Sequence, residues 1–221
     1  MRDVERRKLE KFERQEAFMV DNAADFAVGS VGNTAAVVNR AIIAEMNALA
    51  AEQVSGGSSA AQAVGNKDED LDELWQMMKN MNRAANAFED EIEGGDLKFR
   101  LPRNRSEQNV LATARAFYAD SESLVETFVE YGLSQRFREA LGEKIASITE
   151  QGSNADSSIE QRAGATGGLL DAAQRGMANS RKLDAIVRIK YASNAQKLAA
   201  WTVAAHLDRA PKPKTPSAPP T

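Results

Sequence analysis

Four positively charged residues in one short stretch have the types and spacing that suit the binding of an anion. They lie among apolar residues just before a predicted helix start at Ser106: Lys98, Arg100, Arg103 and Arg105. Guanidinium groups donate paired hydrogen bonds to carboxylates and phosphates, and the unpaired backbone N–H groups of a helix start add further donors. The stretch therefore predicts a site for a small anion or for the acidic face of a partner.

The alternative interpretation of this basic patch is structural. Carboxylates precede it closely in the sequence, at Asp90, Glu91, Glu93 and Asp96. Ion pairs with these carboxylates would make the cations part of an ordinary charged surface. The sequence alone leaves both interpretations open.

Residues of the kinds that perform acid–base, nucleophilic or metal chemistry do not gather anywhere in the sequence. The single histidine, His206, has Val203 three residues before it, whereas a di-iron bundle needs Glu-x-x-His motifs on separate helices. The absence of cysteine excludes thiolate metal sites and cysteine nucleophiles. The acidic run 68–73 lacks the pattern of a calcium-binding loop and fits a helix start, where the helix dipole favours negative charge. We therefore expect a non-enzymatic protein with no catalytic residues, no metal and no cofactor.

Two glycine-rich clusters and two tryptophans have structural interpretations. The clusters 56–59 and 164–168 follow no predicted strand, so neither is a nucleotide-binding loop, and we expect them to accommodate close packing or a bend. Trp75 and Trp201 fall in helical apolar stripes, which predicts positions in the core. An exposed tryptophan is a natural anchor for a partner, so Trp201 joins the four cations as a candidate partner-binding residue.

Composition favours helices and excludes several classes of protein. Hydrophobic residues make up 43% of the 221 residues and aromatic residues 6%, and five of the six prolines lie at or after Pro211. A net charge of -4 argues against nucleic-acid binding, which needs excess cations to displace phosphate counterions. The first residues are charged, and no apolar run approaches the roughly 20 residues that cross a bilayer. We therefore expect a cytoplasmic protein without a membrane partner.

The longest element that the apolar spacing predicts is a helix over residues 134–191. Apolar and small residues recur there every three or four positions, as in helices packed on other helices. This predicted seam consists of Phe137, Leu141, Ile145, Ile148, Gly152, Ala155, Ile159, Ala163, Thr166, Leu170, Ala173 and Met177. Unbroken, the helix would extend roughly 85 Å, beyond the roughly 34 Å diameter of a compact domain of this size. A partner would then have to cover the remaining seam.

Shorter apolar stripes predict the other helices. Their expected ranges are 3–28, 34–55, 68–93, 106–131 with a kink near Asp120, and about 198–207. A glycine costs about 1 kcal/mol in a helix interior, so Gly56-Gly57 favour a turn over the thin middle of one long helix. The same alternative is open at 164–168. We expect one helical domain over 1–208, followed by a disordered proline- and lysine-rich tail over 209–221.

Several short segments of this chain resemble a family of uncharacterised bacterial helical proteins. The segments are Arg2–Glu10, Lys98–Arg103, Arg181–Val187 and Ala199–Trp201, together with the basic proline-rich end. The resemblance implies a bacterial, all-helical protein without an assigned activity. It carries over no functional residue.

The sequence thus predicts an all-α protein, an elongated antiparallel helical bundle with long, coiled-coil-like helices. The uncovered seam leads us to expect a homo-oligomer that acts as a scaffold or as an adaptor for a protein partner, through its long helix faces. The alternative function is a binding module for a small anionic ligand or an acidic partner, at the Lys98–Arg105 patch.

Overall fold

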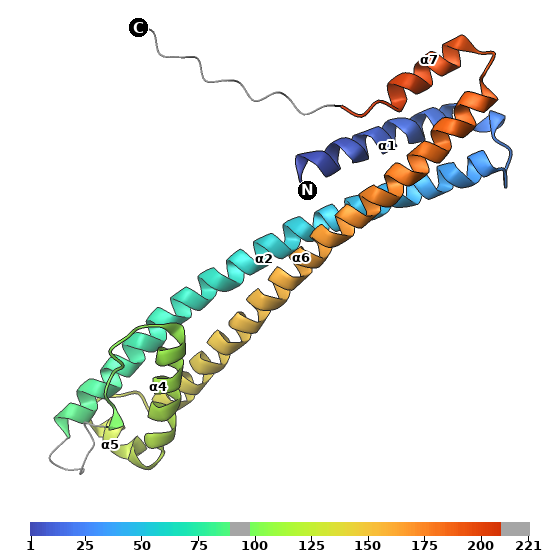
Figure 1. The fold of residues 1–221 in the computed structure, drawn as a ribbon. Coiled ribbons are helices and arrows are strands. Elements are labelled where there is room, and N and C mark those ends of the chain that lie inside the picture. The colour runs from blue at the N-terminus through green and yellow to red at the C-terminus, as the bar shows by residue number, and fades with distance from the viewer. Residues whose placement is uncertain (89–97, 209–221) are drawn as a thin grey trace, which may run out of the picture. The chain divides into compact units, whose positions relative to one another are not determined.

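The chain folds into helices, which the computed structural model describes over residues 1–88 and 98–208. The α-helices in these ranges are α1 (Asp3–Asp21), α2 (Val31–Ala87), α4 (Glu107–Asp120), α5 (Val125–Glu130), α6 (Phe137–Lys190) and α7 (Ala195–Ala204) (Figure 1). Short 3-10 helices lie at Ala23–Asp25 and Glu122–Leu124. The described residues contain no strand, and the predicted all-α class is confirmed.

Two helices, α2 and α6, are much longer than the others, with 57 and 54 residues. The prediction of a turn at Gly56-Gly57 is wrong, because both glycines lie inside α2. The glycine-rich cluster 164–168 likewise lies inside a helix, α6. The predicted helices 34–55 and 68–93 are therefore parts of one element. Helix formation is costly to nucleate but easy to propagate, so a helix already formed on both sides continues through two glycines.

The kink expected near Asp120 is confirmed. α4 ends at Asp120, and a 3-10 turn separates it from α5. The Ser121 hydroxyl donates a hydrogen bond to the Tyr118 carbonyl oxygen, at 3.1 Å. A hydroxyl bonded to the preceding turn in this way competes with the regular helical hydrogen bonds.

The contacts within the chain divide it into two compact units. Unit 1 consists of Met1–Ser55 and Gln161–Thr221, and unit 2 consists of Gly56–Glu160. The long helices α2 and α6 contribute one part to each unit. The single domain expected over 1–208 stays a prediction, and the expected tail over 209–221 lies outside the described residues.

Unit 1 has an aromatic core built from α1, α6 and α7. The Phe18 ring meets the Trp201 ring edge-on, with ring centroids 5.1 Å apart. Trp201 is fully buried, and its indole N–H donates to the Asp184 carboxylate at 2.9 Å. This placement corrects Trp201 as a partner-binding candidate, because the ring fills the core of unit 1 and its one polar atom is already bonded.

Buried amides join the helices of unit 1. The Asn39 side chain of α2 donates to the Phe12 carbonyl oxygen of α1 at 2.8 Å, and the Asn179 side chain of α6 donates to the Ala35 carbonyl oxygen of α2 at 2.9 Å. An amide left without a partner in a core costs about 1–3 kcal/mol. These bonds therefore favour one register of the three helices.

Unit 2 is organised around a cluster of phenylalanines from α2, α6 and the segments between them. Its fully or nearly fully buried members are Phe88, Phe99, Phe117, Phe128 and Phe137. The Phe99 ring lies 5.2 Å from Phe117 and 5.0 Å from Phe128, in both cases edge to face. Such edge contacts add about 0.5–1.5 kcal/mol per pair to the burial of the rings.

The predicted seam of α6 is correct up to Ala155 and wrong over part of the remaining helix. Ile159 and Leu170 are 56% and 37% exposed, whereas Ala165 and Leu169 are buried. The prediction placed two four-residue steps after Ala155, which together move the assumed face around the helix by about 0.8 residue, or roughly 80°. Ile159 and Leu170 are displaced from the core for this reason, whereas Ala173 is buried as predicted.

Two glycines of α6 provide a matched pair of substitutions. A Cβ at Gly176 would lie 2.3 Å from the buried Phe12 ring, whereas a Cβ at Gly164 would have no heavy atom within 4 Å. We expect Gly176→Ala to lower the free energy of unfolding by about 1–3 kcal/mol through overpacking. Gly164→Ala should raise it by about 0.5–1 kcal/mol through helix propensity alone. Urea denaturation followed by circular dichroism measures both, and a Gly176→Ala protein as stable as the wild type would contradict the packing.

Candidate functional site

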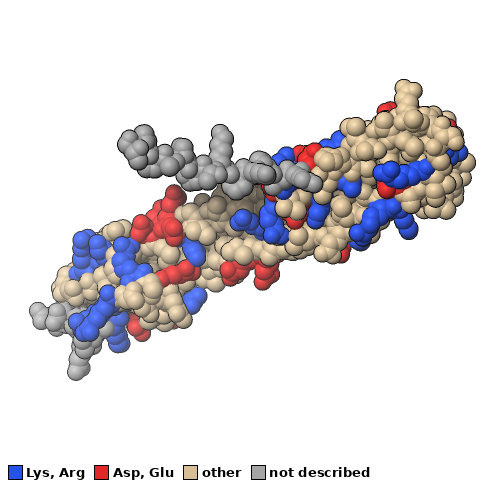
Figure 2. All heavy atoms as spheres, turned by 45° about the horizontal axis from the view of Figure 1, so that its top comes forward, with Lys and Arg blue, Asp and Glu red and all other residues tan. Residues whose placement is uncertain are grey.

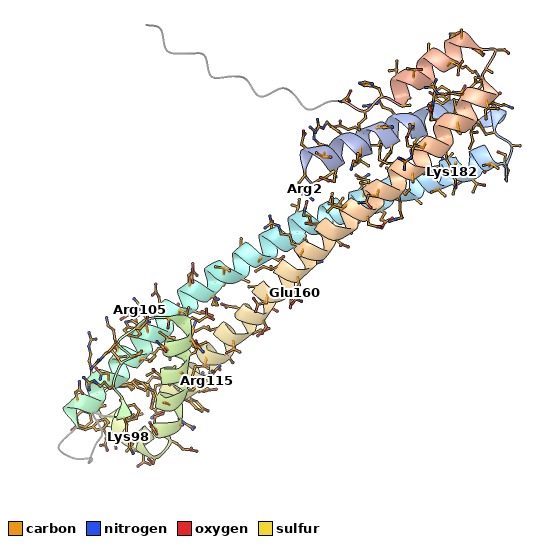
Figure 3. The ribbon with its side chains drawn as sticks, in the orientation of Figure 1. Arg2, Lys98, Arg105, Arg115, Glu160 and Lys182 are labelled. Carbon is orange, nitrogen blue, oxygen red and sulfur yellow. The ribbon has the colours of Figure 1, made fainter. Side chains whose placement is uncertain are left out.

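The predicted basic patch lies on the connection that leads into α4. From Arg100 to Ser106 this connection is neither helix nor strand, and all four cations are exposed. Phe99 anchors its beginning, because the ring is buried and the Phe99 carbonyl oxygen accepts a hydrogen bond from the Asn82 side chain at 2.9 Å. Lys98 and Arg105 lie at opposite ends of the connection (Figure 3). The cations are therefore spread along the chain and do not converge on one point.

The last cation of the patch is already engaged. The Arg105 guanidinium lies 2.6 Å from the Asp72 carboxylate and 4.8 Å from the centroid of the Trp75 ring. Lys98, Arg100 and Arg103 form no ion pair with residues 1–88 or 98–208. The acidic partners considered for them, Asp90, Glu91, Glu93 and Asp96, lie outside the described residues.

The helix start beside the patch carries a negative charge of its own. Glu107 is the first residue of α4, and its carboxylate accepts a hydrogen bond from the Lys67 ammonium at 2.8 Å. A carboxylate at this position repels a second anion that approaches the free N–H groups. The patch therefore presents separate surface cations and not an enclosed anion site.

A serine, a lysine and an aspartate meet between α2 and α6 of unit 2. The Asp70 carboxylate accepts hydrogen bonds from the Lys144 ammonium at 2.7 Å, from the Ser147 hydroxyl at 2.7 Å and from the Gln151 amide at 2.8 Å. The hydrogen bond from Lys144 holds the pKa of Asp70 below its usual value, and hydrogen bonds to Asp70 and Glu73 raise the pKa of Lys144. An ammonium held protonated cannot serve as a base, so this group joins two helices and activates no nucleophile.

The described residues hold neither a metal site nor a membrane-spanning helix. Within 1–88 and 98–208, no three His, Cys, Asp or Glu side chains are placed so that they could hold a metal ion. In the same ranges, no helix combines the length and the apolar composition of a membrane-spanning segment.

Unit 2 contains a groove that the sequence pattern did not predict. It has a volume of about 580 Å³ and lies between the end of α2 and the start of α6. Its apolar lining includes Met77, Met81, Ala84, Leu133, Phe137 and Ala140. Arg83 and Arg136 also line it, and no Asp or Glu does among the described residues. The sequence at the end of α2 contained an indication of this groove. The apolar positions from 74 to 88 cover more of the helix circumference than contact with one neighbouring helix requires.

An apolar surface at one end of unit 1 was not predicted either. We define this valine surface by Val20, Val28, Val31, Val37 and Ile189, all of which are exposed. Two hollows of about 180 and 400 Å³ adjoin it, and Phe26 borders both of them. Figure 2 shows uncharged surface at this end of unit 1, with Lys and Arg side chains beside it on the face in view.

No family model, curated protein or solved structure matches this chain.

The Asp70 group predicts a pH dependence of stability. A carboxylate whose pKa is lower in the folded than in the unfolded state stabilises the fold above the unfolded-state pKa, and this contribution is lost as the pH falls through the folded-state pKa. Asp70→Asn should therefore lower the free energy of unfolding at pH 7 by about 1–3 kcal/mol and make its decline in acid shallower. Denaturant titrations between pH 7 and pH 3 measure both effects.

Asp72→Asn is the matched control for Asp70→Asn. The Asp72 carboxylate is 75% exposed, and it pairs with the exposed Arg105 side chain. Exposed pairs contribute little to stability, so this variant should remain within about 0.5 kcal/mol of the wild type. Equal effects of the two substitutions would contradict a special role for Asp70.

Proposed function

We propose that this protein is a non-enzymatic interaction protein that self-associates through the valine surface of unit 1. The observation that carries the proposal is the exposure of large aliphatic side chains around two hollows, with Val28 96% and Ile189 78% exposed. Burying a Val or Ile side chain is worth about 1.5–3 kcal/mol, and contiguous apolar surface of this kind marks interaction sites.

The shape of the valine surface favours a second copy of the chain as its partner. Ile189 lines one of the hollows that border Phe26, and the exposed Val28 directly follows Ala27, which lines the same hollow. In a two-fold dimer the same patch meets itself, so protrusions of one copy can enter the hollows of the other. The rim carries both signs of charge, with Asp25 and Lys190 lining the same hollow, so the surface does not repel its own copy.

The long helix faces are weaker candidates for assembly than the valine surface. On the parts of α2 and α6 that belong to unit 2, the exposed large aliphatic residues are Val64 and Ile159. Single exposed aliphatic residues are ordinary on protein surfaces. We therefore place the proposed contact on unit 1, which leaves every residue of the unit 2 groove outside it.

Binding of an anion at Lys98–Arg105 is the function that we favour less. Exposed cations without ion pairs among the described residues support it, whereas their spread along the connection and the Glu107 carboxylate oppose it. The triple substitution of Arg100, Arg103 and Arg105 by Ala separates the two proposals. If the valine surface drives assembly, this variant keeps its assembly state.

Introducing charge on the valine surface tests the proposed self-association. We expect the wild-type chain to have a mass of at least two 24.0 kDa chains in light scattering after gel filtration at micromolar concentration. The double variant Val28→Asp, Ile189→Asp should have the mass of one chain, because two carboxylates would have to be buried in an apolar contact. Circular dichroism should show unchanged helix content.

Val203→Asp is the matched control for this experiment. Val203 is 70% exposed on α7 of the same unit but lies outside the valine surface. This variant should assemble like the wild type. A monomeric wild-type chain, or a Val203→Asp variant that also dissociates, would overturn the proposal.

A further inference from the structure

We propose that the groove of unit 2 binds an amphipathic helix of a partner protein, with an apolar face and acidic flanks. This site lies in a different unit from the valine surface and uses none of its residues. It does not depend on self-association.

The arrangement of α2 supports a helix as the occupant. One row of α2, which includes Leu74, Met78 and Ala85, is fully buried in the phenylalanine core that α4 and α5 complete. A second row runs through Met77, Ala84 and Ala87 and lines the groove. At 3.6 residues per turn the second row lies about a quarter of a turn around the helix from the first. A helix with two such apolar rows is suited to two neighbours.

Among the described residues, the groove is lined by the end of α2 and by the segment that leads into the start of α6. In unit 2 the α2–α6 pair packs against α4 and α5 on the side of the phenylalanine core, and no residue of α4 or α5 lines the groove. A partner helix in the groove would cover Met77, Leu133 and Ala140.

The size of the groove matches a short stretch of helix. From Met77 to Ala87 it follows α2 for about 15 Å, which is nearly three helical turns. This length accepts apolar anchors at positions i, i+3 or i+4, and i+7 of a docked helix. Methionine side chains at Met77 and Met81 adapt their shape to such anchors.

The charges of the groove indicate acidic flanks. Arg83 and Arg136 are exposed and line the groove from α2 and from the start of α6. Arg83 has no ion pair with the described residues, and its nearest polar contact is the Asn80 side chain at 3.4 Å. Arg136 pairs with Glu139 at 2.6 Å, but both side chains are more than half exposed, so the pair contributes little and can exchange. Glu or Asp residues beside the apolar face of the partner helix could pair with these guanidinium groups.

The experiment uses synthetic helical peptides and the full chain. The probe is a fluorescein-labelled peptide of three heptads with leucine at the a and d positions and glutamate at e and g. A second peptide has lysine at e and g, and a third has the first composition in scrambled order. Fluorescence anisotropy should show the glutamate peptide binding at least roughly tenfold more tightly than either of the others. Equal binding of the three peptides, or no binding of the first, would overturn the proposal.

Variants of the chain locate the binding. Ala140→Glu places a carboxylate on the exposed edge of the groove and should weaken binding of the glutamate peptide by roughly tenfold or more. Ala116→Glu, at an exposed position of α4 outside the groove lining, is the control and should bind like the wild type. The double variant Arg83→Glu, Arg136→Glu should prefer the lysine peptide. Unchanged preference in that variant would overturn the charge argument and the proposal with it.

The same experiment distinguishes two other possible occupants of the groove. One outcome is that dodecanoate binds the wild-type chain but not the Ala140→Glu variant, while the three peptides bind equally. This outcome would identify a lipid-like ligand and overturn the helix proposal. Loss of self-association in Ala140→Glu would identify a second copy as the occupant and would also overturn it. Because Val28 and Ile189 are outside the groove, their double variant should bind the glutamate peptide like the wild type.

Discussion

The rest of the structure depends on one constraint, which is that within each unit the helices keep a single register. Apolar side chains at helical spacing allow neighbouring registers at little cost, whereas buried polar groups do not. The amides of Asn39 and Asn179 and the carboxylate of Asp70 each find their partner on a facing helix. Displacement of α2 against α6 by one turn would leave Asn179 and Asp70 without these partners, which costs about 1–3 kcal/mol for a buried group such as Asn179. These hydrogen bonds thereby place Met77 opposite the start of α6.

Much of the fold could be predicted from local pattern, since helix type and strong apolar phase depend on residues close in sequence. Phe137, Leu141 and Ile148 were placed in the core of α6 by spacing alone, and they are buried. The apolar phase of α6 cannot be followed beyond Ala155, because serine, glycine and alanine dominate that stretch. These small residues do not distinguish a buried face from an exposed face of the helix. The continuity of α2 through Gly56 is likewise not predicted from local pattern. The local cost of a glycine is outweighed by the cooperative propagation of the helix, which depends on the residues on both sides.

The surfaces could be predicted less well, because each is made by segments that are far apart in the sequence. The groove of unit 2 forms where Met77 of α2 meets Leu133 and Ala140, more than fifty residues later. The position of Trp201 in an apolar stripe fits both a core residue and an exposed anchor for a partner. Its packing against Phe18 in the structure decides for the core. The spacing of the four cations predicts a local concentration of positive charge. Their spread along an extended connection is a property of the backbone path, which spacing does not give.

The order of the two units along the chain has a consequence for how the protein folds. Unit 2 is one continuous segment, whereas unit 1 joins the two ends of the chain, as in the hydrogen bond between Gln15 and Ser180, 165 positions apart. Closing a flexible loop as long as unit 2 costs about 4 kcal/mol of chain entropy. Once unit 2 has formed, however, Ser55 and Gln161 continue helices that are already paired, and most of that entropy has been lost beforehand. During synthesis unit 2 can therefore assemble first and act as the template on which the two chain ends meet.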